Sequence, residues 1–577
     1  MKRRISSLAL ALTVALGLVV PAGAAEYPRT FKGDVMLAVN SSVATGTVVE
    51  GSFTVDEEKS VSLLALEEDE GIYDVWADPD TGEELTILAP VLEMPEPVLD
   101  QNGDEPLLSV RSAAGYQVDS TFSLKSQYCR KGTAEEETMV CVHVGTYCTV
   151  WTSTSDPEAI QLSAEQGAAI GAYFDEHYSA MVSAFGQPHD ADGDGKVAIM
   201  CYDLSDQFVA GVTVTSYTAG YFYGADMIDT SGKVNGVNYG SGSHINGLDC
   251  IHIDTYPTMG NKLENPLSNI SNCYSTLFHE FQHMINYSHQ VKNGAAGYVI
   301  GMETYLDEAF AMAAEHLICG EETTQTRVDF FNSSYSSSKY VAGTPLTYWR
   351  AGDKDATNAE KLSSYSNSFL FGQYMRTRYG QLKGNDGSTL YKTVLESRTE
   401  ENENDTLGII TDLLQTTKEQ LILDFWAAVC CKAPSGVYGF AGETWADAIE
   451  PVVESGFINT AGIYNGGVKY YLPGEEGCTV TASQDVTLMT LSLSGGSDVQ
   501  MVCRETAGQT TLQVEAWGKG ARTAAVILYS SDGRMMGLEW LELTNERVSH
   551  LVETRGLRMQ MLMLGEGVSP LCSALSH

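Results

Sequence analysis

The sequence predicts an α+β protein whose mixed central region is flanked by β-rich regions. From Glu26 to about Lys125, short stretches of alternating hydrophobicity are separated by acidic, turn-rich segments, and alternation returns from about Lys469 onward. Between them, apolar residues recur at helical spacing, and short apolar runs have the length of buried strands. Because side chains repeat every two residues in a strand and about every 3.6 in a helix, these patterns predict the fold class.

The first segment has the three parts of a secretory signal peptide. Basic residues at positions 2–4 precede an apolar run from about Ile5 to Val20, and small residues follow at positions 22–25. A membrane anchor would need about 20 apolar residues, which is more than this run provides. We therefore expect residues 1–24 to be removed as a signal peptide, leaving a secreted, extracellular protein with no membrane span.

The flanking β-rich regions are residues 25–125 and 461–577. In the first, a Pro-, Asp- and Gly-rich piece between Pro95 and Pro106 has the composition of a linker, so a removable propeptide and an accessory module both fit. In the second, alternating stretches such as Val486–Gly495 are joined by Gly- and Asp-containing turns. This pattern predicts a C-terminal β-sandwich-like domain.

The central region, residues 126–460, combines strands and helices. The expected elements are a hairpin around Met139–Trp151, a helix at Ser163–Phe185, buried strands at Val197–Leu204 and Cys250–Pro257, and helical stretches from Asn269 to about Ile458. Alternation of this kind within one region predicts a mixed domain rather than a purely helical one.

Charge excludes one class of partner. The 577 residues include 34 Lys and Arg against 75 Asp and Glu, a formal net charge of −41. Binding to DNA or RNA needs clustered cations, so no nucleic acid is expected as a partner.

The 12 cysteines permit disulfides in an exported protein, but so long a chain does not need them as a framework. Cys141 with Cys148, and Cys478 with Cys503, could pair across hairpins, and buried free thiols fit equally well. No C-x-x-C spacing is present, so a thiolate zinc site is not expected.

The segment Asn269–Tyr287 carries the motif that points to chemistry. Its apolar residues recur at helical spacing, and it contains the sequence HEFQH from His279 to His283. Histidines at i and i+4 lie on one face of a helix, at a separation that one tetrahedral zinc ion can span. Glu280 is turned about 100° from His279. It can therefore face a metal-activated water as general base and then as acid. The alternative is an ordinary amphipathic helix with two surface histidines.

A catalytic zinc site needs a third protein ligand and leaves its fourth position open. The expected helix at Gly301–Gly320 offers two candidates. Spacing alone favours Glu303 as the third ligand, since Asp307 would complete a Glu-x-x-x-Asp pair. Glu308 is the alternative third ligand. Glu315, one helical repeat further, is expected to be solvated or to support a ligand.

Residues Tyr305–Ala311, YLDEAFA, resemble the W-L-N-E-G-F-A signature of the gluzincin zinc metallopeptidases. In that signature the Glu after Asn is the zinc ligand, so the resemblance implies Glu308 as the third ligand. Asp307 takes the Asn position, and Ala309 takes the Gly position.

The resemblance extends beyond this signature. DADGDGKVAIMCYDL, IHIDTYP, HEFQHMINY and SNSFLFGQYMRTRYG occur in an order similar to that of hyicolysin-type metallopeptidases, over roughly Thr138–Gly380. It implies a zincin-like catalytic domain in a secreted endopeptidase, with Zn2+ held by His279, His283 and Glu308.

Other side chains could support catalysis. Tyr365 resembles in position the transition-state tyrosine of aminopeptidase-like gluzincins, and Tyr374 and His316 are further candidates for a donor to a developing oxyanion. Asp254 could orient a ligand histidine, or it could be structural.

Asp190, Asp192 and Asp194 alternate in a Gly-containing loop that resembles the opening of an EF-hand. The twelfth position is Cys201 in place of the bidentate Glu. A Ca2+ site and a plain Asp- and Gly-based turn account for this loop about equally well.

These observations predict a secreted zinc-dependent endopeptidase that hydrolyses peptide bonds by a zinc-activated water, with Glu280 as general base. We expect a monomer that acts on protein or peptide substrates. Two other classes stay open, namely a non-peptidase zinc hydrolase acting on cell-wall polymers and an inactive peptidase-like binding protein. The intact set of His279, Glu280 and His283 argues against an inactive site.

Overall fold

The computed structural model describes residues 35–43, 51–55, 75–77, 84–88, 115–126, 136–204, 216–228, 233–234, 237–238, 246–260, 265–293, 301–332, 345–349, 358–402, 405–451, 453–454, 461–471, 480–482, 486–495, 499–506, 511–565 and 569–577. The expected signal peptide, the linker-like piece between Pro95 and Pro106, and Cys478 lie outside these ranges. The described chain mixes helices and sheets, which is compatible with the predicted α+β class. No helix in the described ranges is both long and apolar enough to cross a membrane.

Contacts divide the chain into two compact units. The first contains residues 70–333 and 349–417, and the second contains residues 1–69, 334–348 and 418–577. Each unit gathers segments that are far apart in the sequence. The linear division at residues 125 and 460 stays a prediction about which parts fold independently.

The first unit is built on a mixed six-stranded sheet in the order β10-β13-β8-β7-β6-β5. Its strands are β5 (Thr121–Lys125), β6 (Glu136–Val144), β7 (Cys148–Ser153), β8 (Val197–Tyr202), β10 (Gly220–Phe222) and β13 (Cys250–Asp254). The predicted hairpin is confirmed, because β6 and β7 pair antiparallel. The two predicted buried strands are β8 and β13, which pair parallel and are buried along their whole length. Continuous apolar runs are typical of strands covered on both faces.

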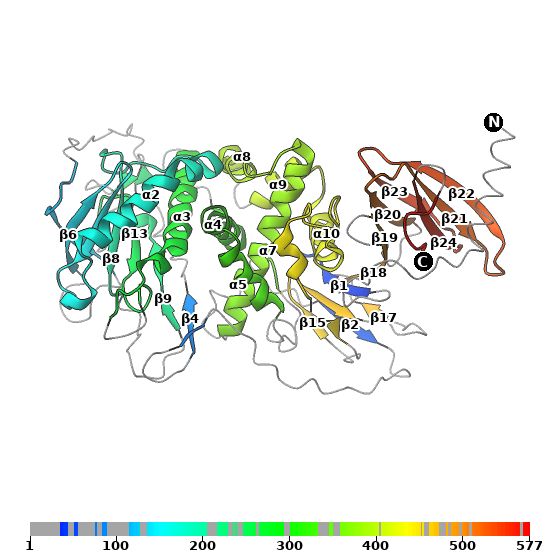
Figure 1. Cartoon of the computed structure of the whole chain (residues 1–577), viewed down its shortest axis with the longest axis horizontal. Coiled ribbons are helices and arrows are strands. Elements are labelled where there is room, and N and C mark those ends of the chain that lie inside the picture. Colours follow the sequence, from blue (N-terminus) through cyan, green and yellow to red (C-terminus); the bar gives the residue numbers. More distant parts are fainter. Residues whose placement is uncertain are drawn as a thin grey trace. The chain divides into compact units, whose positions relative to one another are not determined.

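Helices cover this sheet and extend from it. The predicted helix at Ser163–Phe185 is α2 (Ala164–Phe185), which starts with a capping box between Ser163 and Gln166 and packs against β6 and β7. Helix α3 (Tyr274–Asn293) packs against β10 and β13, and Figure 1 shows it beside β13. The remaining helices of this unit are α4 (Thr304–Cys319), α5 (Glu321–Asn332), α7 (Asn358–Lys383), α8 (Leu390–Ser397) and α9 (Thr406–Leu414).

Helix α4 packs against both α3 and α7. The approach to α7 is close because Gly372 faces Ala309, and a Cβ added to Gly372 would lie 3.1 Å from both the Cβ and the carbonyl oxygen of Ala309. This packing keeps α4 buried on most of its surface, including the side chains of Leu306, Glu308 and Phe310. The helix that carries the predicted third ligand is therefore held firmly beside α3.

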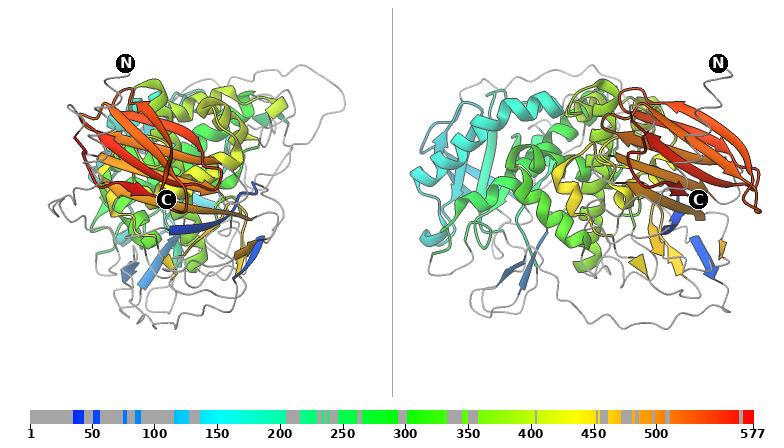
Figure 2. Two further views of the ribbon diagram at one scale, coloured as in Figure 1. Left: turned by 90° about the vertical axis from the view of Figure 1, so that its right-hand side faces the viewer. Right: turned by 45° about the vertical axis from the view of Figure 1, so that its right-hand side comes forward.

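The second unit contains α10 (Lys418–Cys431) and two large sheets. A seven-stranded sheet has the order β14-β16-β1-β18-β19-β20-β23, and a four-stranded sheet has the order β22-β21-β24-β25. Side chains from both sheets, among them Met501, Val514, Val526 and Met561, form one apolar cluster. Figure 2 shows the C-terminal strands, coloured orange to red, as two facing layers.

The bounds of these strands are β1 (Val35–Asn40), β14 (Val453–Glu454), β16 (Val468–Tyr471), β18 (Val486–Gly495), β19 (Val499–Thr506), β20 (Thr511–Gly518), β21 (Thr523–Tyr529), β22 (Met535–Glu542), β23 (Arg547–Glu553), β24 (Arg558–Leu564) and β25 (Leu575–Ser576).

The strands of the N-terminal region are distributed among several sheets. Strand β1 pairs with β16 on one side and β18 on the other. Strand β2 (Gly51–Val55) lies between β15 (Ala461–Ile463) and β17 (Val480–Ala482). In the first unit, β4 (Glu84–Leu88) pairs with β3 (Val75–Ala77) and with β9 (Ser216–Thr218). The described parts of residues 25–125 are therefore built into sheets with later segments of the chain.

Cysteines contribute to packing in the described part of the chain. Ten of them are free thiols there, including Cys141, Cys148 and Cys503. The hairpin cysteines Cys141 and Cys148 are thus not joined by a disulfide in this structure, and both side chains are buried.

Candidate metal centre

Helix α3 presents His279 and His283 on one face because its apolar side chains occupy the other. Phe278 and Phe281 are fully buried and pack against Phe174 of α2, with ring centroids 5.7 and 4.9 Å away. The i and i+4 spacing then brings the imidazoles together edge to face, with their ring centroids 4.8 Å apart.

Helix α4 brings Glu308 to the same point. Its Oε2 atom lies 3.3 Å from Nε2 of His279 and 3.9 Å from Nε2 of His283, and the two Nε2 atoms are 3.1 Å apart. Glu308 is fully buried. One ligand atom from each of the three residues lies within 4.8 Å of the others, a grouping that could hold a metal ion.

These separations fit zinc. A tetrahedral zinc ion with bonds of about 2.0–2.2 Å separates its ligand atoms by about 3.3–3.6 Å, and the three separations of 3.1, 3.3 and 3.9 Å lie on both sides of that range. Both carboxylate oxygens of Glu308 are buried without a hydrogen-bond partner. A cation at this point would satisfy them, since an unpaired buried carboxylate is costly.

The far side of each imidazole is held by a carboxylate. Nδ1 of His279 lies 2.6 Å from Oε1 of Glu315, and Nδ1 of His283 lies 2.9 Å from Oδ1 of Asp307. If each Nδ1–H donates to its carboxylate, each Nε2 is left as an acceptor directed at Glu308. Three acceptor atoms then converge, which is the arrangement that a metal ion needs.

Electrostatics agree with this geometry. Burial alone would lower the pKa of His279, but its contacts with the Glu308 and Glu315 carboxylates outweigh burial and raise that pKa well above its usual value. Burial likewise opposes charge on Glu315, yet Arg327 and His279 hold its pKa below the usual value. The site therefore favours positive charge between the histidines and keeps the supporting carboxylate ionised.

Glu280 lies beside the cluster without joining it. It is 1% exposed, and neither carboxylate oxygen has a hydrogen-bond partner. Burial raises the pKa of Glu280 to about 7, although the neighbouring His279 and His283 favour its ionised form. A carboxyl group with a pKa near neutrality can both accept and release a proton.

The other candidate ligand, Glu303, serves a different purpose. It is the N-cap residue of α4, and its two carboxylate oxygens accept hydrogen bonds from the backbone amides of Thr406 (3.2 Å) and Leu407 (3.4 Å). These amides begin α9, so the carboxylate complements the positive end of that helix. Glu303 is not among the residues grouped with His279 and His283.

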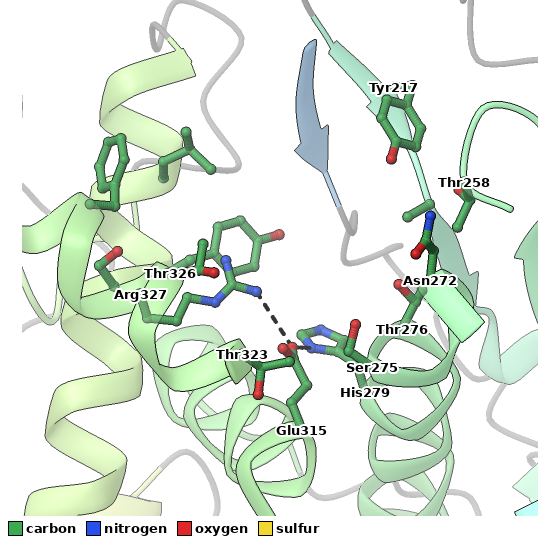
Figure 3. Close-up of a pocket in the computed structure, with 15 residues that line it drawn as sticks. Tyr217, Thr258, Asn272, Ser275, Thr276, His279, Glu315, Thr323, Thr326 and Arg327 are labelled. Atoms are coloured by element: carbon green, nitrogen blue, oxygen red, sulfur yellow. Dashed lines mark hydrogen bonds and ion pairs between the residues drawn. The ribbon is translucent and has the colours of Figure 1, made fainter. Parts of the chain in front are cut away.

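A pocket lies beside His279 (Figure 3). Its walls include Asn272, Ser275 and Thr276 next to His279, Thr323, Thr326 and Arg327 of α5, and Leu362, Tyr365 and Ser366 of α7. Figure 3 shows Arg327 pointing at Glu315 from the α5 side, with a separation of 3.5 Å, and Glu315 meeting His279. Sequence analysis did not identify Arg327, which carries no local signal.

Tyr365 lies in the α7 wall of this pocket. It is 5% exposed, packs against Trp349 and lies beneath the Arg327 guanidinium, 5.7 Å from its ring centroid. Burial and the carboxylates of Glu308 and Glu280 raise the pKa of Tyr365 well above its usual value. Its hydroxyl therefore stays protonated and can donate a hydrogen bond.

The remaining candidates lie elsewhere. Tyr374 is fully buried and does not line the pocket, and Nδ1 of His316 meets the hydroxyl of Thr324 at 2.6 Å. Asp254 accepts hydrogen bonds from the backbone amides of Leu204 and Thr258, so it ties the end of β13 to its neighbours. These contacts favour the structural interpretation of Asp254.

The predicted calcium loop does not support a calcium site. Asp190 accepts from the amides of Gly193 and Gly195, Asp192 from the amide of Asp194, and Asp194 from the amide of Lys196. A self-capped turn accounts for these carboxylates. The acidic side chains close enough to share a metal ion are Asp190, Asp192 and Asp249. This set contains Asp249 in place of the expected Asp194.

A further buried group contains Asp226, Cys250 and His252. Nε2 of His252 meets Asp226 at 2.7 Å, and its Nδ1 meets the hydroxyl of Tyr202 at 3.1 Å. Both ring nitrogens thus have protein partners, and the group is a structural hydrogen-bond network.

In the described part of this mixed fold, His279, His283 and Glu308 form a buried group that could hold one metal ion. No family model matches the sequence. The chain is similar to the curated neutral metalloprotease ShpI of Staphylococcus hyicus, with 32% identity over 290 residues. The match covers 50% of this chain and 58% of that protein, so it spans less than two thirds of the relative. This likeness agrees with the resemblance to hyicolysin-type metallopeptidases.

Proposed function

We propose that the protein is a secreted zinc-dependent endopeptidase of the gluzincin type, with His279, His283 and Glu308 as zinc ligands. The observation that carries the proposal is the convergence of their three acceptor atoms beside the buried carboxylate of Glu280. The likeness to a neutral metalloprotease supports proteins or peptides as substrates. The basic and apolar start of the sequence supports export.

When bound, zinc would supply Lewis acidity that polarises the scissile carbonyl and eases deprotonation of the attacking water. Glu280 would accept the proton from that water and deliver it to the departing amine. Its burial suits both steps, because a carboxyl group with a pKa of about 7 exchanges protons readily near neutral pH.

The surrounding residues would keep the reacting groups in place. Glu315 and Asp307 hold the imidazoles with Nε2 directed inward. Tyr365 would donate from its hydroxyl to the oxyanion that develops on the substrate. The pocket beside His279 would receive the peptide chain.

The decisive experiment compares the wild type with Glu280→Gln. The variant should keep one zinc per chain, because Glu280 is not a ligand, and should lose nearly all cleavage of casein. Glu165→Gln, an exposed position in the first turn of α2, is a matched control and should match the wild type in both measurements. Casein cleavage by Glu280→Gln at the wild-type rate would disprove the proposed mechanism.

Two further outcomes separate the alternative functions. A wild-type protein that binds zinc and digests cell-wall polymers but not casein would be a non-peptidase hydrolase. A protein that binds no zinc and cleaves neither substrate would be a binding protein on a peptidase-like scaffold.

A further inference from the structure

Each imidazole of the candidate centre is supported by a carboxylate, and each carboxylate is linked in turn to an arginine. The two arginines differ in burial. On the His279 side, Glu315 meets Arg327, whose side chain is 24% exposed and lines the pocket. On the His283 side, Asp307 also accepts from Nδ2 of Asn286, and Oδ1 of Asn286 accepts from Arg398 at 3.3 Å. Arg398 is 1% exposed.

Arg398 connects the two helices that carry the ligands. Its guanidinium donates to Asn286 on α3 and to the carbonyl oxygen of Gly301, three residues before α4 begins. It follows α8 in the sequence, 112 residues from Asn286 and 97 from Gly301. Burial lowers the pKa of Arg398 to about 10, while the charges of Asp307 and Glu303 act in the other direction and favour its cationic form. A buried cation is retained where opposite charges and hydrogen bonds offset its desolvation.

Along this series of hydrogen bonds from Arg398 to His283, the donors and acceptors allow only one orientation of the Asn286 amide and of the His283 ring. A guanidinium has only donors, so it faces the oxygen of the Asn286 amide. The amide nitrogen of Asn286 must then face Asp307, whose carboxylate can only accept. The same carboxylate oxygen accepts from Nδ1–H of His283, which leaves the Nε2 lone pair directed at Glu308.

We propose that Arg398 is a positioning residue of the metal centre, which acts through Asn286 and Asp307 to hold His283 with Nε2 facing the metal. This inference rests on the proposed function only in requiring that His279, His283 and Glu308 bind zinc. Arg398 is 1% exposed and does not line the pocket beside His279, so its loss changes metal affinity before it changes peptide recognition.

The test measures the zinc Kd of the full chain by competition with a chelator, together with the visible spectrum of the cobalt-substituted protein. Arg398→Met should weaken the affinity for zinc about 10- to 100-fold, the range found when partners of metal ligands are removed. It should also shift the cobalt spectrum, because His283 loses its fixed orientation. Arg398→Lys keeps a cationic donor and should recover part of the lost affinity.

A matched control separates positioning from general destabilisation. Arg504, a buried arginine paired with Asp424 at 2.7 Å in the second compact unit, has no role in the metal centre. Arg504→Met should lower the melting temperature of the metal-free protein and leave the zinc Kd unchanged.

The outcomes are distinguishable. Wild-type zinc affinity in Arg398→Met, with a melting temperature lowered as in Arg504→Met, would make Arg398 a structural residue and overturn the inference while leaving the proposed function intact. If Arg398→Met does not fold, Asn286→Leu tests the same chain, and unchanged zinc affinity there would overturn the inference. Absence of zinc binding in the wild type would overturn the inference and the proposed function together.

Discussion

The Oε2 atom of Glu308 lies 3.3 Å from Nε2 of His279, and the Glu308 carboxylate has no hydrogen-bond partner of its own. A fully buried carboxylate in that state is stabilised when a cation binds between it and the imidazole. The same relationship separates the two candidate third ligands, because the oxygens of Glu303 are already engaged by the start of α9.

Glu308→Gln should therefore weaken the affinity for zinc by about 100-fold or more, which is at least as much as the loss of a residue that supports a ligand does. Glu303→Gln should leave zinc affinity unchanged and lower the free energy of unfolding by about 1 kcal/mol, because it removes the charge at the N-terminus of α9. Metal titration and urea unfolding of both variants test this pair. If Glu303→Gln binds zinc more weakly than Glu308→Gln does, Glu303 is the third ligand.

Tyr365→Phe should lower kcat by roughly 100- to 1,000-fold with little change in KM or zinc affinity, because it removes a single donor to the oxyanion. Tyr374→Phe is the control, since Tyr374 belongs to the same helix but does not line the pocket. Steady-state kinetics on one peptide substrate measure both. If the two variants are equally active, the donor is another group.

The metal-free protein should show a pH dependence that belongs to Glu280. Its pKa is raised to about 7 in the folded protein, so its contribution to stability is full below its unfolded pKa of about 4.3 and is lost as pH rises through about 7. That loss is up to about 3 kcal/mol. Glutamine cannot ionise, so Glu280→Gln should match the wild type near pH 4.5 and exceed it in stability at pH 8.

Urea unfolding in the presence of EDTA at the two pH values measures this difference. A constant difference in unfolding free energy between wild type and Glu280→Gln across this range would show that folding does not favour the protonated carboxyl.

The mature protein should keep strand β1. This strand hydrogen-bonds to β16 and β18 on its two edges, and Val35, Leu37 and Val39 are fully buried. Its removal would leave two open strand edges and cost about 5 kcal/mol or more from lost apolar burial. Intact mass and N-terminal sequencing should place the mature start near residue 25. A mature start near residue 125, in a stable protein that lacks the upstream fragment, would contradict this prediction.

Local sequence predicted much of the first unit because its elements follow from short-range periodicity. The helix α2, the hairpin of β6 and β7, and the parallel strands β8 and β13 appear within a few residues of their expected bounds. The HEFQH segment placed His279 and His283 on one helix face for the same reason, since i and i+4 residues meet in any α-helix.

Partners distant in the sequence gave no such signal. An alternating pattern predicts that Val35–Asn40 is a strand, but it does not identify Val486–Gly495 as its neighbour. Arg327 and Arg398 lie in segments with no recognisable motif, and they become meaningful only where the fold brings them to Glu315 and Asn286.

By itself, then, the sequence determined the two histidines, the glutamate between them and the mixed fold class, because these depend on helix and strand repeats. A family resemblance added Glu308. Only the tertiary structure decided how the carboxylates divide their roles. Glu303 and Glu308 are five residues apart on one segment, and which of them meets the histidines depends on how α4 packs against α3, α7 and α9. Packing between distant segments sets that geometry, and local periodicity carries no information about it.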